Sequence, residues 1–406
     1  MYLTFAWRYF KAKKSTNAIN IISWVTLCVI AFSTMCQVLV LSVFNGFEDL
    51  VRSLYSNFYT DVRVIPTKGK TIFLSPEQIN SIKRFNGVKH ISLVAQEKAL
   101  LQNGELQTVV FLKGVDNNYH NVSGVPQKML RGDFATGTAD EPLLILGAGI
   151  ESAVGVQSDN SLAPLTVFLP KKTGSISSDP SSSLSEGNAF TSGSFAIQQD
   201  FDNKFVLTNI DFLKQQMNYA VNEYSAVEIA LNNPEQLEEI TNSLQSMLGG
   251  NFRVQTKYQQ NTSLYTSMKV EKWAIYAVLT LILIIAAFNM ISALTMLVLE
   301  NRKDISVLQS LGADKSLILK IFLSEGLILA VTGAAIGLSL ATIICALQAK
   351  FKLVKLSGNS FLIDYFPVKL IVTDFILVAS TALLIAFIAA WFPAKKAAHQ
   401  AFELRN

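Results

Sequence analysis

Four long apolar stretches without a single charge constrain this chain more than any other feature. They cover residues 20–47, 274–299, 327–349 and 375–394. A helix needs roughly 20 apolar residues to cross the ~30 Å hydrocarbon core of a bilayer, and each stretch is long enough. Half of all residues are hydrophobic and 16% are charged, which also favours a membrane protein. The sequence therefore predicts an α-helical bundle of four transmembrane helices.

The spacing of these stretches predicts how the chain is divided. A long polar segment separates the first stretch from the other three, and its ordinary soluble composition predicts a large folded domain. With the orientation and the strand and helix patterns given below, this becomes a large α+β extracytoplasmic domain. The predicted parts are an N-terminal segment 1–19, helix 20–47, domain 48–270, helix 271–299, connection 300–325, helix 326–349, loop 350–370, helix 371–394 and tail 395–406.

Basic residues predict the orientation, because short loops rich in Lys and Arg face the cytoplasm. Three basic clusters fall on one side of the membrane if the chain crosses it four times. Both termini are then cytoplasmic, and only the lysines of loop 350–370 oppose this assignment. The first stretch is about twice as long as a signal-peptide core and no A-x-A site follows it, so we keep it as a span. The clusters are Arg8, Lys11, Lys13 and Lys14; Arg302, Lys303, Lys315 and Lys320; and Lys395, Lys396 and Arg405; the opposing residues are Lys350, Lys352, Lys355 and Lys369.

Two segments of the large domain have the same pattern of strand, capped helix and strand. Ser75 and Asn233 are placed as helix N-caps, each is followed by proline, and Gln78 and Gln236 sit where a capping box needs them. We infer that the two β-α-β units pack together as one membrane-proximal subdomain, residues 48–91 and 211–270. The alternative is two unrelated capped helices.

The middle of the domain, residues 92–210, is predicted to be rich in strands. Asn103 and Gly104 lie between two alternating runs, which is a strong signal for a hairpin. The segment 174–194 is rich in serine and glycine, so we expect a loop that forms no packed element. It is either a tolerated insertion or an arm that docks a partner, with Phe190 as its aromatic residue. Further strands are expected at 143–146, 165–169, 195–199 and 205–208.

The sequence shows no motif for catalysis. Residues 68–71 imitate the end of a phosphate-binding loop, but Val64 stands where that motif requires glycine. His90, His120 and His399 have no ligand spacing around them. We therefore expect no catalytic residue, metal or cofactor in this chain, and no nucleic-acid partner. Any work that the chain performs must draw its energy from another subunit.

A short elbow joins the second and third apolar stretches. Ile305, Leu308 and Leu311 share one helical face there, and Gly312 is placed to end the helix. Without catalytic groups, the elbow is either a contact surface or an inert connection. Gly333 and Gly337 form a small-xxx-small pair that suits close helix contact in the third span.

Blocks along nearly the whole chain resemble one permease family. They read FAWRYFKAKKS, INIISWVTLCVIAFS, VLSVFNGFEDLV, MKVEKWAIYAVLTLILIIAAFNMISAL, the elbow with its VLQSLGA, and FPAKKAAHQAFEL. The family includes the lipoprotein-releasing proteins LolC and LolE, the efflux protein MacB and the division protein FtsX. The blocks are most similar to the LolC/LolE branch.

The resemblance implies partners and a coupling site. Members of the family pair into homodimers or heterodimers and bind two copies of a separate cytoplasmic LolD-like ATPase, which holds the ATP and magnesium. The elbow is the family's contact with that ATPase. The β-α-β units resemble the family's porter subdomain and the middle resembles its outer subdomain. In this chain the implied ATPase contacts are Arg302, Asp304, Ile305, Leu308, Leu311 and Lys315.

In the LolC/LolE branch the acyl chains of a lipoprotein enter between the first and second spans of two subunits. The residues that match this cavity are Leu41, Phe44, Phe47, Phe288 and Ile291; ordinary packing is the alternative for each. A loop at the position of 174–194 docks a LolA-like carrier in LolC but not in LolE, and Pro180 and Phe190 are the implied contacts here. The long serine-rich loop matches only by position, which leaves open a LolC-like role, a LolE-like role, or both in a homodimer.

The function that the resemblance implies is a permease subunit that extracts lipoproteins from the bacterial inner membrane and passes them to a periplasmic carrier. Two alternatives remain. One is a MacB-like efflux permease, although in that group the ATPase is usually fused to the permease. The other is an FtsX-like signalling scaffold for cell-wall hydrolases, although such scaffolds usually have a much smaller outer domain.

Overall fold

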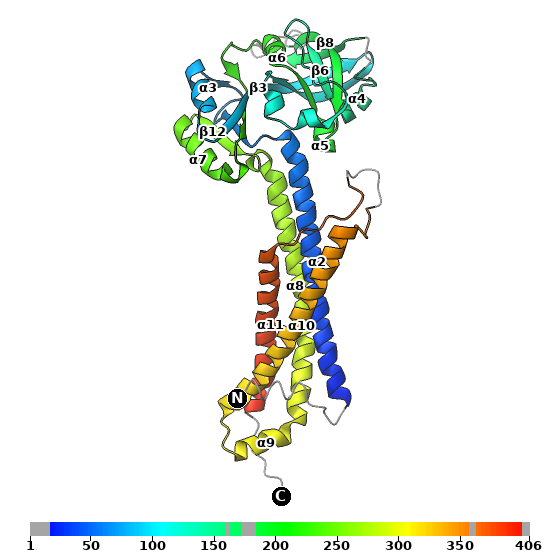
Figure 1. Ribbon diagram of the computed structural model, residues 1–406, viewed down its shortest axis with the longest axis vertical. Coiled ribbons are helices and arrows are strands. Elements are labelled where there is room, and N and C mark those ends of the chain that lie inside the picture. The colour runs from blue at the N-terminus through cyan, green and yellow to red at the C-terminus, as the bar shows by residue number, and fades with distance from the viewer. Residues whose placement is uncertain (1–16, 160–162, 172–183, 357–362, 400–406) are drawn as a thin grey trace, which may run out of the picture. The chain divides into compact units, whose positions relative to one another are not determined.

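The computed structural model describes residues 17–159, 163–171, 184–356 and 363–399 (Figure 1). The chain divides into two compact units. We name Met1–Leu50 with Thr266–Asn406 the helical unit and Val51–Tyr265 the α+β unit. Each unit is described by itself.

In the part of the helical unit that the structure describes, four helices are long and apolar enough to cross a membrane, as the sequence predicts. All four are longer than predicted, although the last exceeds its predicted range by only a few residues. The first does not end at Phe47, where the charges begin, because the apolar residues that follow it recur at helical spacing and pack into the α+β unit. The helices are α2 (Asn17–Phe58), α8 (Thr262–Glu300), α10 (Lys315–Phe351) and α11 (Val372–Ala398), with the short α9 (Arg302–Ser310) between α8 and α10.

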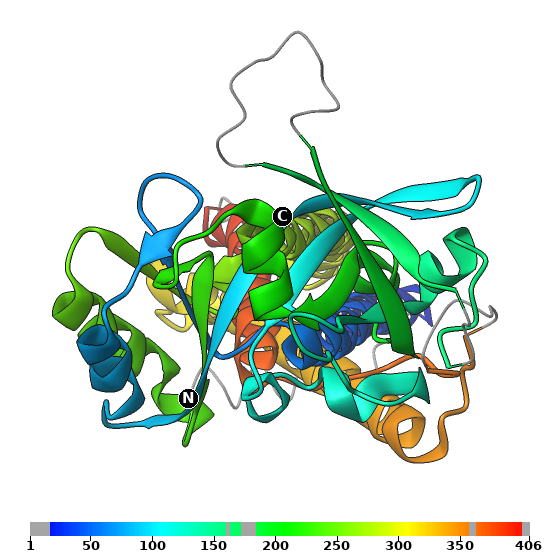
Figure 2. The same ribbon diagram turned by 90° about the horizontal axis from the view of Figure 1, so that it is seen from above.

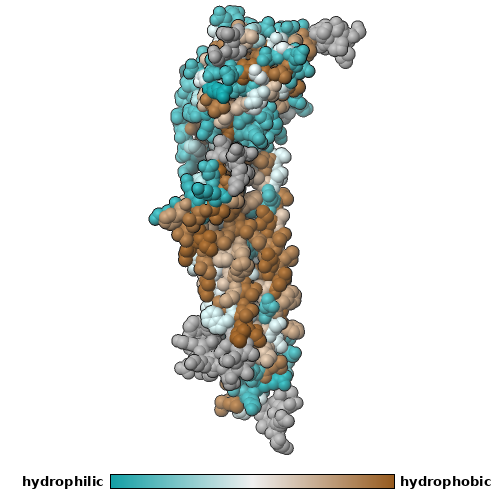
Figure 3. Space-filling model, turned by 90° about the vertical axis from the view of Figure 1, so that its right-hand side faces the viewer, coloured by the Kyte–Doolittle hydropathy of each residue, from teal (hydrophilic) through white to brown (hydrophobic). Residues whose placement is uncertain are grey.

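Residues from all four long helices meet in one apolar cluster. It contains Leu27 of α2, Met290 of α8, Leu329 of α10 and Ala386 of α11. Figure 3 shows apolar side chains, in brown, gathered over the face of this unit. Such helices satisfy their own backbone hydrogen bonds, which lipid requires.

Two glycines bring α10 against α2, as the small-xxx-small pattern predicts. A Cβ atom on Gly337 would lie 2.3 Å from the carbonyl oxygen of Ala31 and 2.1 Å from Oγ1 of Thr34. A Cβ atom on Gly333 would lie 3.0 Å from the side chain of Ile30. Because only glycine fits without movement at position 337, the backbones of the two helices are in direct contact.

Among its described residues, the α+β unit contains a ten-stranded sheet, a separate two-stranded sheet and five short α-helices. Strand β7 pairs with both β3 and β8, which closes β3, β4, β9, β6, β8 and β7 into a ring. Helix α6, green in Figure 2, packs on this ring with Ile210, Leu213 and Met217. The strands are β1 (Val62–Pro66), β2 (Ile72–Phe73), β3 (Val88–Asn103), β4 (Leu106–Val115), β5 (Met129–Gly132), β6 (Leu143–Gly147), β7 (Leu165–Pro170), β8 (Leu184–Phe195), β9 (Phe205–Asn209), β10 (Glu223–Tyr224), β11 (Ala226–Leu231) and β12 (Phe252–Thr256), and the helices are α3 (Pro76–Lys83), α4 (Ala148–Ala153), α5 (Gln199–Asp202), α6 (Ile210–Met217) and α7 (Leu237–Leu248).

The two predicted β-α-β units are present and lie side by side. Their strands follow one another in the order β12-β1-β11-β3, and α3 and α7 contribute Ile82 and Ile240 to one shared core. Ser75 and Gln78 form the predicted capping box. Asn233 accepts a hydrogen bond from the backbone of Glu235, but it begins a 3-10 turn, Pro234–Gln236, and not the α-helix itself.

Part of the predicted serine-rich loop is a strand, so that expectation is wrong for residues 184–194. They belong to β8, which pairs with β7, β6 and β5. Neighbours distant in sequence supply its backbone partners, and composition alone cannot show them. The strand expected at 195–199 is also wrong, because β8 ends at Phe195 and α5 starts at Gln199. Pro180 lies outside the described residues.

Replacing Gly337 with Leu should lower the stability of the helical unit by about 1–3 kcal/mol, because the larger side chain overpacks the α2–α10 contact. The measurement is thermal unfolding of the full chain in detergent. Gly250→Leu is the matched control, since no atom lies within 4 Å of a Cβ at that exposed position. An equal effect of both substitutions would contradict the close contact.

Candidate functional site

The elbow has an inner and an outer face. Ile305 is buried with Leu297 of α8, Ile318 of α10 and Ala397 of α11. Leu308 is half-buried and lines a small hollow with Ile305 and Ile318. These two side chains, which the sequence placed on the contact face, therefore attach α9 to its own unit.

The outer face of the elbow is exposed and partly apolar. Leu311 is 80% exposed and Val307 is 57% exposed. Arg302, Asp304 and Lys315 are exposed as well. The sequence analysis did not include Val307 among the contact residues, and no pattern in the sequence distinguishes it as part of this outer face.

The five residues assigned to an acyl-chain cavity do not come together within this chain. Leu41 is 1% exposed and packs with Val38 and Ala341, whereas Phe288 is 64% exposed. Ile291 packs on the cluster that contains Ile30, which lies about 16 Å from Leu41 along α2. The ring of Phe47 contacts that of Phe366 with centroids 5.9 Å apart, and Phe44 is half-buried.

A polar stripe runs along α8 where it meets α2 and α11. Lys272 Nζ lies 2.8 Å from Oδ1 of Asn45 and 3.2 Å from Oδ1 of Asp374, and Asn45 donates to Asp374 at 2.6 Å. One and two turns further along α8, Tyr276 bonds Thr381 of α11, and Thr280 accepts a hydrogen bond from Gln37 of α2. These spacings of four residues place Lys272, Tyr276 and Thr280 on one helical face.

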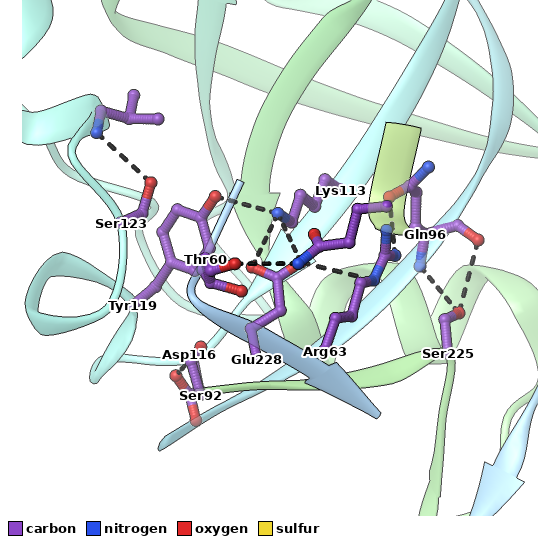
Figure 4. A network of polar contacts seen from close by, with 12 residues as sticks. Thr60, Arg63, Ser92, Gln96, Lys113, Asp116, Tyr119, Ser123, Ser225 and Glu228 are labelled. Atoms are coloured by element: carbon purple, nitrogen blue, oxygen red, sulfur yellow. Dashed lines mark hydrogen bonds and ion pairs between the residues drawn. The ribbon is translucent and has the colours of Figure 1, made fainter. Parts of the chain in front are cut away.

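In the α+β unit, charged residues from three strands meet beside the last turn of α2. Lys113 of β4 and Glu228 of β11 are both 2% exposed and form an ion pair with Nζ–Oε1 at 2.9 Å (Figure 4). Arg63 of β1 lies 3.7 Å from the same carboxylate. The hydroxyl of Tyr119 accepts a hydrogen bond from Lys113 at 2.9 Å, and burial raises the pKa of this tyrosine.

The last turn of α2 is attached to the same place. Lys113 Nζ lies 5.0 Å from the ring centroid of Phe58, the residue that ends α2. The Phe58 ring stacks on Phe201 with centroids 4.4 Å apart. One turn earlier, Tyr55 donates to Asp200 at 2.6 Å, and this hydrogen bond lowers the pKa of Asp200. Ionic, aromatic and hydrogen-bond contacts together therefore fix the end of α2 to the sheet.

The described part of the proposed docking segment offers one exposed aromatic residue. Phe190 lies in β8 opposite Leu143 of β6 and is 47% exposed. Strand pairing therefore holds the backbone of Phe190 in place.

Comparison with known proteins gives matches along nearly the whole chain. Residues 276–402 match the family model for the FtsX-like permease C-terminal region. The chain is 24% identical to the lipoprotein-releasing system transmembrane protein LolC of Xylella fastidiosa (strain 9a5c) over 402 residues, which cover 96% of this chain and 95% of the relative. It is 22% identical to LolE of Haemophilus influenzae over 404 residues, which cover 97% of this chain and 96% of the relative.

The chain resembles the LolC/LolE-type permeases over nearly its whole length. This confirms the resemblance inferred from the sequence blocks. Among solved structures, the periplasmic region of MacB from Actinobacillus actinomycetemcomitans aligns with a TM-score of 0.36 and 12% identity, over 53% of this chain and 95% of that one.

Replacing Lys113 with Met should destabilise the α+β unit of this LolC/LolE-like chain by about 3–5 kcal/mol, because Glu228 is left buried without its main partner. The double variant K113M/E228Q removes both charges and should recover most of that loss. Hydrogen–deuterium exchange of peptides from β4 and β11 in the full chain measures both effects. A double variant no more stable than K113M would contradict the pairing.

Proposed function

We propose that this chain is the transmembrane permease subunit of an ATP-driven complex that extracts lipoproteins from the bacterial inner membrane and hands them to a periplasmic carrier. The observation that carries the proposal is the similarity, over 96% of the chain, to a protein named as part of a lipoprotein-releasing system. The four candidate membrane helices agree with this role. The chain acts as a permease and not as an enzyme.

The energy comes from a separate cytoplasmic ATPase of the LolD type, which binds ATP and magnesium. We propose that this partner contacts the outer face of the elbow through Val307 and Leu311, with Arg302, Asp304 and Lys315 as polar contacts. The exposure of these side chains supports the assignment. Both chain termini and the elbow then face the cytoplasm, and the α+β unit is periplasmic.

The need for ATP follows from the cost of removing acyl chains from lipid. Each buried CH₂ group contributes about 0.8 kcal/mol, so two or three long chains hold a lipoprotein by some tens of kcal/mol. Full transfer to water exceeds what one nucleotide-driven step supplies. We infer that the acyl chains move between apolar sites and do not enter water.

A second permease subunit, identical or LolC/LolE-like, completes the apolar site. Leu41 and Ile291 lie at different levels of the helical unit and Phe288 is exposed, so one chain does not enclose a cavity from them. We propose that Phe288, with Phe44, Phe47, Leu41 and Ile291, contributes to a cavity formed between two subunits. A LolA-like carrier receives the lipoprotein at the α+β unit, where Phe190 is the available aromatic contact.

Depletion of the protein in its own bacterium should leave lipoproteins in the inner membrane. Density-gradient separation of the two membranes, followed by detection of a lipoprotein, measures this. An outer-membrane barrel protein without acyl chains serves as the control and should be located normally. Normal arrival of lipoproteins in depleted cells would reject the proposed function.

Leu311→Glu should weaken binding of the partner ATPase at least tenfold, because it places a charge in the apolar centre of the contact. Pull-down of the ATPase with the full chain from detergent extracts measures the binding. Leu106→Glu, at an exposed apolar position in the α+β unit, is the matched control. If the Leu311→Glu variant recovered as much ATPase as the parent, the proposal that the elbow contacts the ATPase would be rejected.

A further inference from the structure

Basic and apolar residues alternate where α10 ends. The sequence from Lys350 to Lys355 reads KFKLVK, and every residue in it is exposed. Leu353 is 66% exposed, and Phe351 and Val354 are exposed to a similar degree. Helix α10 stops at Phe351 because Lys352 adopts a left-handed backbone conformation, with φ at 51°.

Two of the three lysines of this segment have aromatic neighbours, and none of the three has an acidic partner among the residues that the structure describes. Lys352 Nζ lies 4.1 Å from the ring centroid of Tyr365, and Lys350 Nζ lies 5.5 Å from that of Phe351. No described carboxylate lies within ion-pair distance of Lys350, Lys352 or Lys355. No carboxylate that the structure describes therefore neutralises the positive charge of the segment.

The backbone of the segment is held in a defined shape. Gln348 donates to the carbonyl oxygens of Val354 and Phe366 at 3.0 and 3.1 Å, and its own oxygen accepts from the Val354 N–H at 2.9 Å. Lys355 and Tyr365 form an isolated β-bridge. The side chains of the segment thus project from a fixed turn.

The position of this turn places it at the surface of the bilayer. It follows directly on a helix long and apolar enough to cross a membrane, so it leaves that helix at the bilayer surface. Apolar side chains enter the boundary between headgroups and acyl chains, and lysine ammonium groups stay at the level of the phosphates. Each Lys near an anionic membrane surface adds about 1 kcal/mol of attraction.

We propose that residues 350–355 form a binding surface for anionic phospholipid headgroups of the leaflet at which α10 ends. The lipid fixes this end of α10 at the membrane surface. This surface also accounts for three of the four lysines that oppose the positive-inside pattern, because a lipid contact retains Lys350, Lys352 and Lys355. The proposal is independent of what the permease transports.

The test is a lipid titration of the full chain in detergent after removal of bound lipid, followed by native mass spectrometry. The probes are phosphatidylglycerol, phosphatidylcholine and inorganic phosphate. We expect phosphatidylglycerol to bind most tightly and inorganic phosphate not to displace it. The variant K350Q/K352Q/K355Q should bind phosphatidylglycerol about a hundredfold more weakly, since it loses three lysines.

The matched control is K350R/K352R/K355R, which keeps the charge and should retain binding within a fewfold. Equal thermal unfolding of the Gln and Arg variants excludes a folding defect as the cause of any difference. The proposal is overturned if the Gln variant binds phosphatidylglycerol like the parent, or if phosphatidylcholine binds as well. Displacement by inorganic phosphate would reduce the surface to a free-anion site. If the Gln variant lost a co-purifying acidic protein but bound lipid unchanged, the surface would be assigned to a protein partner.

Discussion

The buried ion pair between Lys113 and Glu228 is the interaction on which the base of the α+β unit depends. Both charges are removed from water, which costs several kcal/mol per ion, and only close pairing and additional hydrogen bonds offset that cost. Arg63 and the hydroxyl of Tyr119 supply the remaining partners, and Phe58 supplies an aromatic face. The charges are therefore satisfied only when β1, β4 and β11 lie together in the sheet as observed and the end of α2 packs beside them. In this way the ion pair selects one arrangement of these four elements.

The sequence predicted the elements of this protein better than their ends and contacts. Hydropathy found the four long helices, and the Ser75 capping box located α3 within a residue. Local composition misjudged β8, because the partners of a strand lie far away in the sequence. The first charged residues predicted an end of α2 at residue 47 that is too early. The helix continues to Phe58 because the apolar residues beyond the uncharged stretch pack in another core.

In the candidate site, too, local sequence patterns did not reveal contacts between residues far apart in the chain. Lys113 and Glu228 each interrupt an apolar strand, which marks both as unusual, but nothing local pairs residues 115 positions apart. On the elbow, the spacing of Ile305 and Leu311 placed both on one face, and the structure separates them because α9 ends at Ser310, before Leu311. Helical periodicity does not extend beyond the residue at which a helix stops.

The two faces of the elbow give the short helix α9 a mechanical consequence. Its inner face, through Ile305, packs on side chains of α8, α10 and α11 at once, including Leu297, Phe322 and Ala397. A close-packed interior has little compressibility and transmits displacement. A force applied at the exposed Val307 and Leu311 is therefore shared among three helices and not absorbed by the connection. Along α8, the Lys272 contacts to Asn45 of α2 and Asp374 of α11 join the first of the four long helices to this packed set.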